Sequence, residues 1–172
     1  SRDEWRPIDL ATASFGQGIA VTGIQMVQAV SAFANGGKLV TPKITDITSS
    51  DDKKQKVEPD QVRQIISPKT AAQITEMMVN SVEEGEARAF APIGYTIAGK
   101  TGTAQIPVAG HYDPEKTIAS FIGFAPARDP KFVMLVRFTE PSSSPFGSET
   151  AAPTFFEIAR ELFNYYGIPP GK

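Results

Sequence analysis

The order of predicted elements in this 172-residue chain indicates an α+β fold, an antiparallel sheet flanked by helices. Two helical patterns come first, three strand patterns follow one another without a helix between them, and a helical pattern ends the chain. This order does not suit the alternating β-α-β units that build a parallel sheet. With 41% hydrophobic and 21% charged residues, the composition is that of one globular domain.

Each of the two early helices has a start signal and a stop signal. The first follows the N-cap Thr22, places apolar residues at three- and four-residue spacing, and stops at the Asn-Gly-Gly of 35–37. The second begins at Ser67, with Pro68 in its first position, and stops at Gly85. The segments around them are predicted as a mixed stretch with a turn at 16–18 (1–20), an extended stretch (38–47) and an exposed loop or hairpin tip (48–59).

Three strands and a last helix are predicted in the second half. The strands cover 95–106, 117–125 and 132–139, and the short turn between the last two makes them an antiparallel hairpin. A Ser/Pro/Gly loop then leads to a helix predicted over 151–166. Its apolar stripe is expected to consist of Phe155, Ala159, Leu162 and Tyr166, with Phe163 beside it.

Charge and rare residue types exclude several function classes. A net charge of −2 gives no electrostatic reason to expect a nucleic-acid partner. The absence of cysteine excludes disulfides, thiolate metal sites and a cysteine nucleophile, and a single histidine, His111, does not make a histidine-rich metal cluster. We therefore expect no metal and no cofactor, and we interpret His111 as an exposed loop residue between two strands. No run of about 18 apolar residues is present to span a bilayer.

One stretch matches two unrelated catalytic motifs. Residues 94–101 spell G-x-x-x-x-G-K-[ST], the phosphate-binding P-loop, and residues 100–102 spell K-T-G, a motif of penicillin-recognising serine enzymes. A P-loop needs a strand, a glycine-rich turn and then a helix. Here 95–98 favour a strand, and the Gly-Thr-Ala-Gln-Ile-Pro of 102–107 has no helical stripe. The P-loop hydrolase is thus an alternative that the flanking residues disfavour.

As a strand, the same residues suit carboxylate binding. Alternation places Thr101 and Thr103 on one face and Lys100 on the other. Gly102 has no side chain, so a ligand backbone could lie close against the strand. Two hydroxyls around a glycine can hold a carboxylate, and a free strand edge can pair with an extended peptide. The structural alternative is a Thr-rich edge strand in which the glycines mark a bulge.

Several stretches resemble the C-terminal half of the transpeptidase domain of penicillin-binding proteins. The resemblance covers nearly the whole chain and implies the C-terminal part of the serine β-lactamase and penicillin-binding-protein transpeptidase fold. The Thr-Ala-Gln that follows K-T-G is similar to the monofunctional class B type, and 8–16 (Ile-Asp-Leu-Ala-Thr-Ala-Ser-Phe-Gly) is similar to the cell-division or sporulation branch. The other matching stretches are 16–18 (Gly-Gln-Gly), Gln25-Met26, 32–37 (Ala-Phe-Ala-Asn-Gly-Gly), 98–105 (Ala-Gly-Lys-Thr-Gly-Thr-Ala-Gln) and 119–126 (Ala-Ser-Phe-Ile-Gly-Phe-Ala-Pro).

The resemblance implies a role for each residue of the motif. Lys100 would take part in the hydrogen-bond and proton network of the active site. The hydroxyls of Thr101 and Thr103, on either side of Gly102, would bind the carboxylate of a terminal D-alanine or of a β-lactam. The backbone amide of Thr103 would be one of two oxyanion-hole donors, a contribution worth roughly 3 to 4 kcal/mol in acyl transfer.

Two further motifs of the family, S-x-x-K with the nucleophilic serine and S-x-N, should precede K-T-G. The formal S-x-x-K from Ser50 to Lys53 lies in the most hydrophilic run of the chain, where two adjacent aspartates keep the lysine protonated. We therefore do not expect Ser50 to be a nucleophile, and no S-x-N lies between Lys53 and Lys100. Residues 1–172 are thus expected to be the C-terminal part of one transpeptidase domain, inactive in isolation, with the nucleophile in sequence outside it. The family's topology also places two sheet strands upstream, which predicts an unpaired edge on strand 132–139.

The resemblance implies a peptidoglycan D,D-transpeptidase on the outer face of the bacterial cytoplasmic membrane, working by a serine acyl-enzyme. Its expected partners are stem peptides ending in D-Ala-D-Ala, β-lactams, the N-terminal part of the same protein and a membrane glycosyltransferase. The rival hypotheses are a non-catalytic binding or scaffolding domain of the same fold and the P-loop nucleotide hydrolase.

Overall fold

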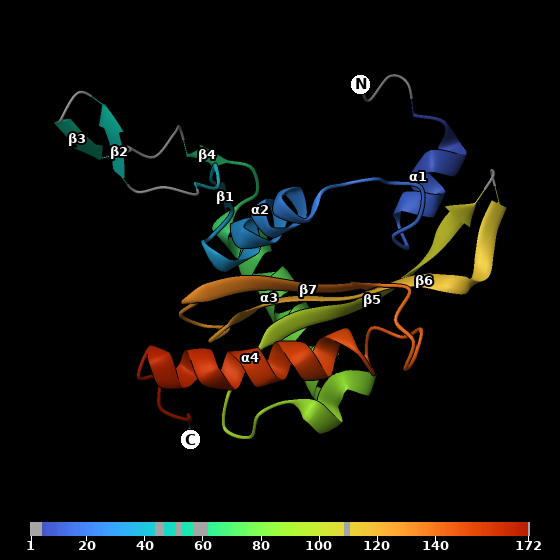
Figure 1. Ribbon diagram of the computed structural model, residues 1–172. Helices are drawn as coiled ribbons and strands as arrows, with labels where there is room; N and C mark the ends of the chain where they lie inside the picture. Colours follow the sequence, from blue (N-terminus) through green and yellow to red (C-terminus); the bar gives the residue numbers. More distant parts are fainter. Residues whose placement is uncertain (1–4, 44–46, 51–52, 57–61, 109–110, 172) are drawn as a thin grey trace.

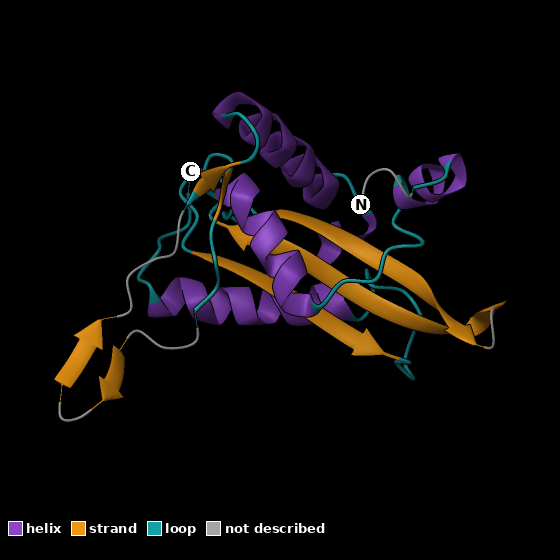
Figure 2. Cartoon of the chain, turned by 90° about the horizontal axis from the view of Figure 1, so that it is seen from above, coloured by secondary structure: helices purple, strands orange, loops and turns teal. Residues whose placement is uncertain are grey.

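The computed structural model describes residues 5–43, 47–50, 53–56, 62–108 and 111–171. Its centre is a three-stranded antiparallel sheet in the order β5-β6-β7, formed by β5 (Ala98–Val108), β6 (His111–Ala125) and β7 (Phe132–Thr139). Helix α4 (Ala151–Tyr165) covers one face and α2 (Gly23–Ala34) the other, as Figure 1 shows. Helix α3 (Pro68–Glu83) packs against β5, so the predicted α+β arrangement with helices around an antiparallel sheet is confirmed (Figure 2).

The two early helices begin at the predicted caps. Thr22 accepts the amide of Gln25 at 3.3 Å, and Ser67 accepts the amide of Thr70 at 3.0 Å. Each hydroxyl satisfies one of the amides that the first turn of a helix leaves without an internal partner. A 3-10 helix, η2 (Glu86–Phe90), follows α3 and leads toward the sheet.

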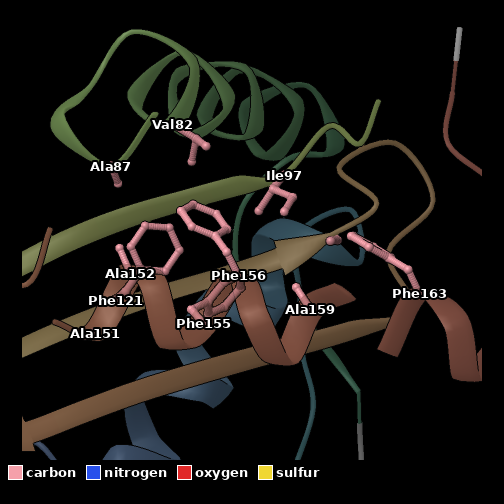
Figure 3. Packing of buried hydrophobic residues seen from close by; sticks show 11 residues of the cluster. Val82, Ala87, Ile97, Phe121, Ala151, Ala152, Phe155, Phe156, Ala159 and Phe163 are labelled. Atoms are coloured by element: carbon pink, nitrogen blue, oxygen red, sulfur yellow. The ribbon is translucent and has the colours of Figure 1, made fainter. Parts of the chain in front are cut away.

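Side chains alternate along the strands between two apolar cores. One core lies between the sheet and α4, and Figure 3 shows Phe121 of β6 against Phe155 and Phe156 of the helix. Their ring centroids lie 4.6 and 5.1 Å from that of Phe121. The other core lies toward α2 and α3 and contains Phe124. The predicted opposite faces of β6 and β7 are therefore confirmed.

The apolar stripe of α4 differs from the prediction at its C-terminal end. Tyr166 is 49% exposed and lies just past the helix, as its C-cap, so it does not extend the core. The buried face instead begins with two neighbouring pairs of small and aromatic side chains and narrows to single residues, so it is wider than one stripe at its N-terminal end. Its buried members are Ala151, Ala152, Phe155, Phe156, Ala159 and Phe163.

The predicted strand 95–106 begins later than expected and changes register near its end. Tyr95 stacks on Phe163, with ring centroids 4.0 Å apart, and its hydroxyl donates to the Ile168 carbonyl at 3.1 Å. These contacts with the C-terminal segment hold Tyr95 outside the ladder, which starts at Ala98. The β5–β6 register then shifts between Gln105 and Pro107, where proline has no amide proton to donate.

The N-terminal region contains a helix that the prediction of a mixed segment missed. Helix α1 (Pro7–Ala13) has no buried residue, so its sequence lacks the apolar stripe from which a helix is predicted. Its first turn is held locally: Asp9 accepts the Arg6 amide at 2.8 Å and the Arg6 guanidinium at 3.0 and 3.1 Å. The predicted turn over 16–18 is confirmed, with positive φ at both of its glycines.

Two small antiparallel pairs lie outside the main sheet. Strand β1 (Lys38–Leu39) pairs with β4 (Arg63–Gln64), so within the stretch predicted as extended 40–43 are not strand, and 44–46 lie outside the described residues. Strand β2 (Ile47–Ser50) pairs with β3 (Lys53–Lys56), so of the two alternatives predicted for 48–59, an exposed loop or a hairpin tip, the structure shows a hairpin (Figure 1). His111, predicted in a loop, belongs to β6 opposite Val108, because the long β5–β6 ribbon extends past the register shift.

Candidate functional site: the outer strand of the sheet

The K-T-G residues lie on β5, an outer strand of the described sheet. Lys100 faces Ile122 of β6, Thr101 faces Phe121 and Gly102 faces Ser120. Directly opposed residues of an antiparallel pair share a face of the sheet. The side chain of Thr101 therefore lies on the face covered by α4, and that of Lys100 lies on the face covered by α2. The two side chains are on opposite faces, as the alternation along a strand predicts.

Lys100 turns its ammonium group back toward the motif. Its Nζ donates to the Thr101 carbonyl oxygen at 3.0 Å and to the Thr101 Oγ1 at 3.2 Å. Because β6 occupies the other side of β5, the lysine reaches these atoms around the outer edge of the strand. No carboxylate among the described residues lies within ion-pair distance of it, so a positive charge and a hydroxyl stand together at this edge.

Gly102 lies against a neighbouring side chain. A Cβ placed on it would lie 2.6 Å from the Ser120 Oγ, closer than unbonded atoms approach. The Ser120 hydroxyl is also within 3.4 Å of the Gly102 carbonyl oxygen, which it contacts as a long hydrogen bond. A glycine therefore keeps the strand surface flat at the centre of the motif.

Thr103 is exposed and makes a contact that the sequence did not reveal. Its Oγ1 accepts the backbone amide of Gly147 at 3.1 Å, from the loop that precedes α4. The loop was predicted from its proline and serine residues, but nothing in their pattern indicated that the loop contacts the K-T-G motif. The strand thus presents two hydroxyls, one ammonium group and an outer backbone edge, a set of groups that suits a carboxylate-bearing extended ligand.

The remaining sequence candidates lie elsewhere or do not fit. Ser50 and Lys53 end β2 and start β3 and face each other in that hairpin, separate from the main sheet (Figure 1). The P-loop hypothesis is wrong, because β5 continues as strand through Thr101 and no helix begins there. A concavity of about 440 Å³ lies between α2, α3 and the β6–β7 turn, but none of residues 100–103 lines it.

Within the described ranges, no group of three His, Cys, Asp or Glu side chains gathers to hold a metal ion. The described helices also include none with the length and apolar character needed to cross a membrane.

The antiparallel sheet has helices on both faces and carries K-T-G on an outer strand, and K-T-G is a motif of the penicillin-recognising serine enzymes. The family model described as penicillin binding protein transpeptidase domain matches residues 1–161. The chain belongs to the penicillin-binding protein transpeptidase family.

Relatives and solved structures agree with this assignment. The chain is 42% identical over 172 residues to Stage V sporulation protein D of Bacillus subtilis, covering 96% of this chain and 26% of that protein. It is 36% identical over 170 residues to the probable peptidoglycan D,D-transpeptidase PenA of Neisseria meningitidis, covering 98% of this chain and 28% of that protein. The chain therefore spans about a quarter of the length of these curated relatives.

Solved structures show the same fold. The transpeptidase domain of penicillin-binding protein 3 from Burkholderia pseudomallei matches with a TM-score of 0.83 and 32% identity, over all of this chain and 50% of that one. Penicillin-binding protein 3 from Mycobacterium tuberculosis, complexed with ampicillin, matches with a TM-score of 0.88 and 28% identity, over 99% of this chain and 40% of that one.

Proposed function

We propose that this chain is the K-T-G-bearing, C-terminal part of the transpeptidase domain of a peptidoglycan D,D-transpeptidase. The observation that carries the proposal is the placement of Thr101 and Thr103 around Gly102 on an outer strand, with the Lys100 ammonium group beside them. The names of relatives such as PenA of Neisseria meningitidis and PbpC of Pseudomonas aeruginosa, both probable peptidoglycan D,D-transpeptidases, support it.

In the proposed reaction, a serine outside residues 1–172 is the nucleophile. Its hydroxyl oxygen attacks the carbonyl carbon between the two D-alanines of a donor stem peptide and forms an ester. The terminal D-alanine leaves with the proton that the serine loses. An amine of a second stem peptide then attacks the ester, which forms the cross-link and restores the serine.

The hydroxyls of Thr101 and Thr103 would bind the carboxylate of the terminal D-alanine. Both Cβ atoms lie on the same face, so two donors can converge on one carboxylate across Gly102. Lys100 would supply positive charge next to this carboxylate and join the proton network of the absent serine. The contacts of its Nζ with Thr101 support a position at the same edge.

The backbone amide of Thr103 would be one of the two oxyanion donors. A Cβ built on Gly147 would lie 2.5 Å from the Gly102 carbonyl oxygen and 3.1 Å from the Ser120 nitrogen. This arrangement suits a hydrogen-bonded Gly102–Ser120 pair. Bonded and non-bonded pairs alternate in an antiparallel ladder, so the amide of Thr103 would point away from β6 toward the outer edge.

The proposal extends to location and partners. The whole protein would act at the extracytoplasmic face of the cytoplasmic membrane, on stem peptides ending in D-Ala-D-Ala, and β-lactams would acylate it. It would work with the N-terminal part of the same protein and with a membrane glycosyltransferase, and not with nucleic acid. The likeness to Stage V sporulation protein D favours the division or sporulation branch over other class B enzymes.

Fluorescent penicillin provides the test. We expect the full-length protein to take up the label on a serine outside residues 1–172, and the isolated chain to remain unlabelled. A full-length protein that takes up no label would overturn the enzyme proposal and leave the alternative, a non-catalytic binding domain of the same fold. An adduct on Ser50 of the isolated chain would overturn the assignment of the nucleophile.

A further inference from the structure

The loop before α4 reaches across the sheet to the ligand-facing end of the motif. The backbone amide of Gly147 donates to the Thr103 Oγ1 at 3.1 Å, a contact between residues 44 positions apart. No other side-chain or backbone group is seen to bond this hydroxyl among the described residues. This contact uses one acceptor lone pair of the Thr103 hydroxyl, so it determines which hydrogen bonds the hydroxyl can still form.

Close packing explains why a glycine stands at 147. A Cβ there would lie 2.4 Å from the Ser120 carbonyl oxygen and 2.5 Å from the Gly102 carbonyl oxygen. Both are backbone atoms of paired strands, which cannot turn aside as a side-chain end can. Any larger residue would have to move the loop away from β5, and the amide would move with it.

Three hydrogen bonds hold the loop in place on both sides of Gly147. Thr117, which is 5% exposed, donates its hydroxyl to the Pro145 carbonyl at 2.9 Å. Thr150 donates its hydroxyl to the Phe146 carbonyl at 2.7 Å, and the amide of Ala152 donates to the Gly147 carbonyl at 2.9 Å. The position of the Gly147 amide is therefore determined by the sheet and by the first turn of α4.

We infer that Gly147 is a positioning residue that makes the Thr103 hydroxyl a proton donor to the carboxylate of the ligand. A hydroxyl has one proton and accepts with its lone pairs. With one lone pair engaged by the Gly147 amide, the proton of Thr103 points away from the loop, toward the open side of the strand. The amide also polarises the hydroxyl, which strengthens the bond it donates. This inference rests on the proposed function, because it concerns the same carboxylate.

The test compares two ligands that differ only in the carboxylate, benzylpenicillin and its methyl ester, on the full-length protein. For Gly147→Ala we expect the acylation rate constant for benzylpenicillin to fall about tenfold, since bonds to charged groups are the stronger ones, and the value for the ester to change less than about twofold. Gly23→Ala is the matched control, because a Cβ at Gly23 meets only Leu135 at an ordinary 3.5 Å.

A double-mutant cycle separates positioning from a general loss of structure. In a Thr103→Val background the amide has no hydroxyl to orient, so Gly147→Ala should then change the benzylpenicillin rate by less than about twofold. If Gly147→Ala does not fold, Thr117→Val loosens the same loop without a backbone clash and should lower the acid-to-ester ratio in the same direction.

The outcomes are distinct. The inference is supported if Gly147→Ala lowers the ratio of the acylation rates for benzylpenicillin and its methyl ester, and if this effect disappears in the Thr103→Val background. An equal loss for both ligands, or an undiminished effect of Gly147→Ala in the Thr103→Val background, overturns it while leaving the proposed function standing. A wild-type protein that neither ligand acylates overturns the proposed function, and this inference with it.

Discussion

Gly102 faces Ser120 across the β5–β6 ladder, and a Cβ placed on Gly102 would lie 2.6 Å from the Ser120 Oγ. The Ser120 Cβ lies 4.0 Å from the same point, which is an ordinary contact. The conflict that a side chain at 102 would create is thus with one hydroxyl group. A second substitution at Ser120 can therefore separate two effects of a side chain at 102, the loss of stability and the loss of ligand binding.

We predict that Gly102→Ala lowers both the melting temperature and the rate of acylation of the full-length protein. The first loss arises because Ser120 must turn, and the second because a methyl group keeps the ligand backbone off the strand. Adding Ser120→Ala should restore the melting temperature but not the acylation rate. Recovery of both in the double variant would show that Gly102 serves packing alone.

Lys100→Met should abolish most acylation and leave folding intact. Lys100 is exposed and, among the described residues, donates only to Thr101, so its loss should change the free energy of unfolding by less than about 1 kcal/mol. We expect the acylation rate to fall at least about a hundredfold, because the charge beside the reacting groups is removed. Lys100→Arg should rescue little, since a planar guanidinium does not reproduce the geometry of an ammonium group. An acylation rate within about threefold of wild type would contradict the role given to Lys100.

Phe155 anchors α4 to the sheet beneath the site. It is fully buried and packs against Phe121 and Phe156 (Figure 3). Phe155→Ala should therefore lower the free energy of unfolding by about 3 to 5 kcal/mol, measured by chemical denaturation. Tyr165→Ala, on the same helix but 81% exposed, is the control and should change it by less than about 0.5 kcal/mol. Equal effects of the two variants would contradict the described packing of α4.

The Arg6–Asp9 pair predicts a pH dependence confined to α1. The hydrogen bond from the Arg6 guanidinium, together with the Arg6 backbone amide and its charge, lowers the pKa of Asp9. A lowered pKa means that the stabilisation is present above the pKa of an unfolded aspartate and is lost as pH falls through the folded value, below about pH 4. The raised pKa of Arg6 keeps that guanidinium charged throughout this window.

An NMR titration of the Asp9 carboxyl carbon checks this sign. Arg6→Ala should move the midpoint upward, toward the ordinary value for aspartate, while the backbone bond from residue 6 keeps part of the shift. A midpoint that Arg6→Ala does not move would contradict the pairing seen in the structure.

Elements with local signals were predicted from the sequence, and those fixed by distant contacts were not. The caps Thr22 and Ser67 lie within a few residues of the amides that they accept. The side chains of β7 alternate between the two apolar cores, so the bounds of this strand were found. The predicted start of the strand at Tyr95 was wrong because Tyr95 contacts Phe163 and the Ile168 carbonyl, and both residues are far from it in the sequence. Helix α1 was not predicted because none of its residues is buried.

The candidate site divides in the same way. The arrangement of Lys100, Thr101 and Thr103 follows from a period of two along one strand, which the sequence shows directly. The contact from Gly147 and the opposition of Ser120 depend on how a loop and a second strand pack on that strand. Glycine in a Ser/Pro-rich loop is expected of any turn, so its close approach to β5 became evident only in three dimensions.

The most direct test of the central claim is a crystal structure of the full-length protein acylated by benzylpenicillin. We predict that the penicillin carboxylate lies within about 3 Å of the Oγ1 atoms of both Thr101 and Thr103, and that the acyl carbonyl oxygen accepts the Thr103 amide. An acyl-enzyme whose carboxylate is bound by other residues, with both threonine hydroxyls left facing solvent, would contradict the claim that this strand binds the ligand.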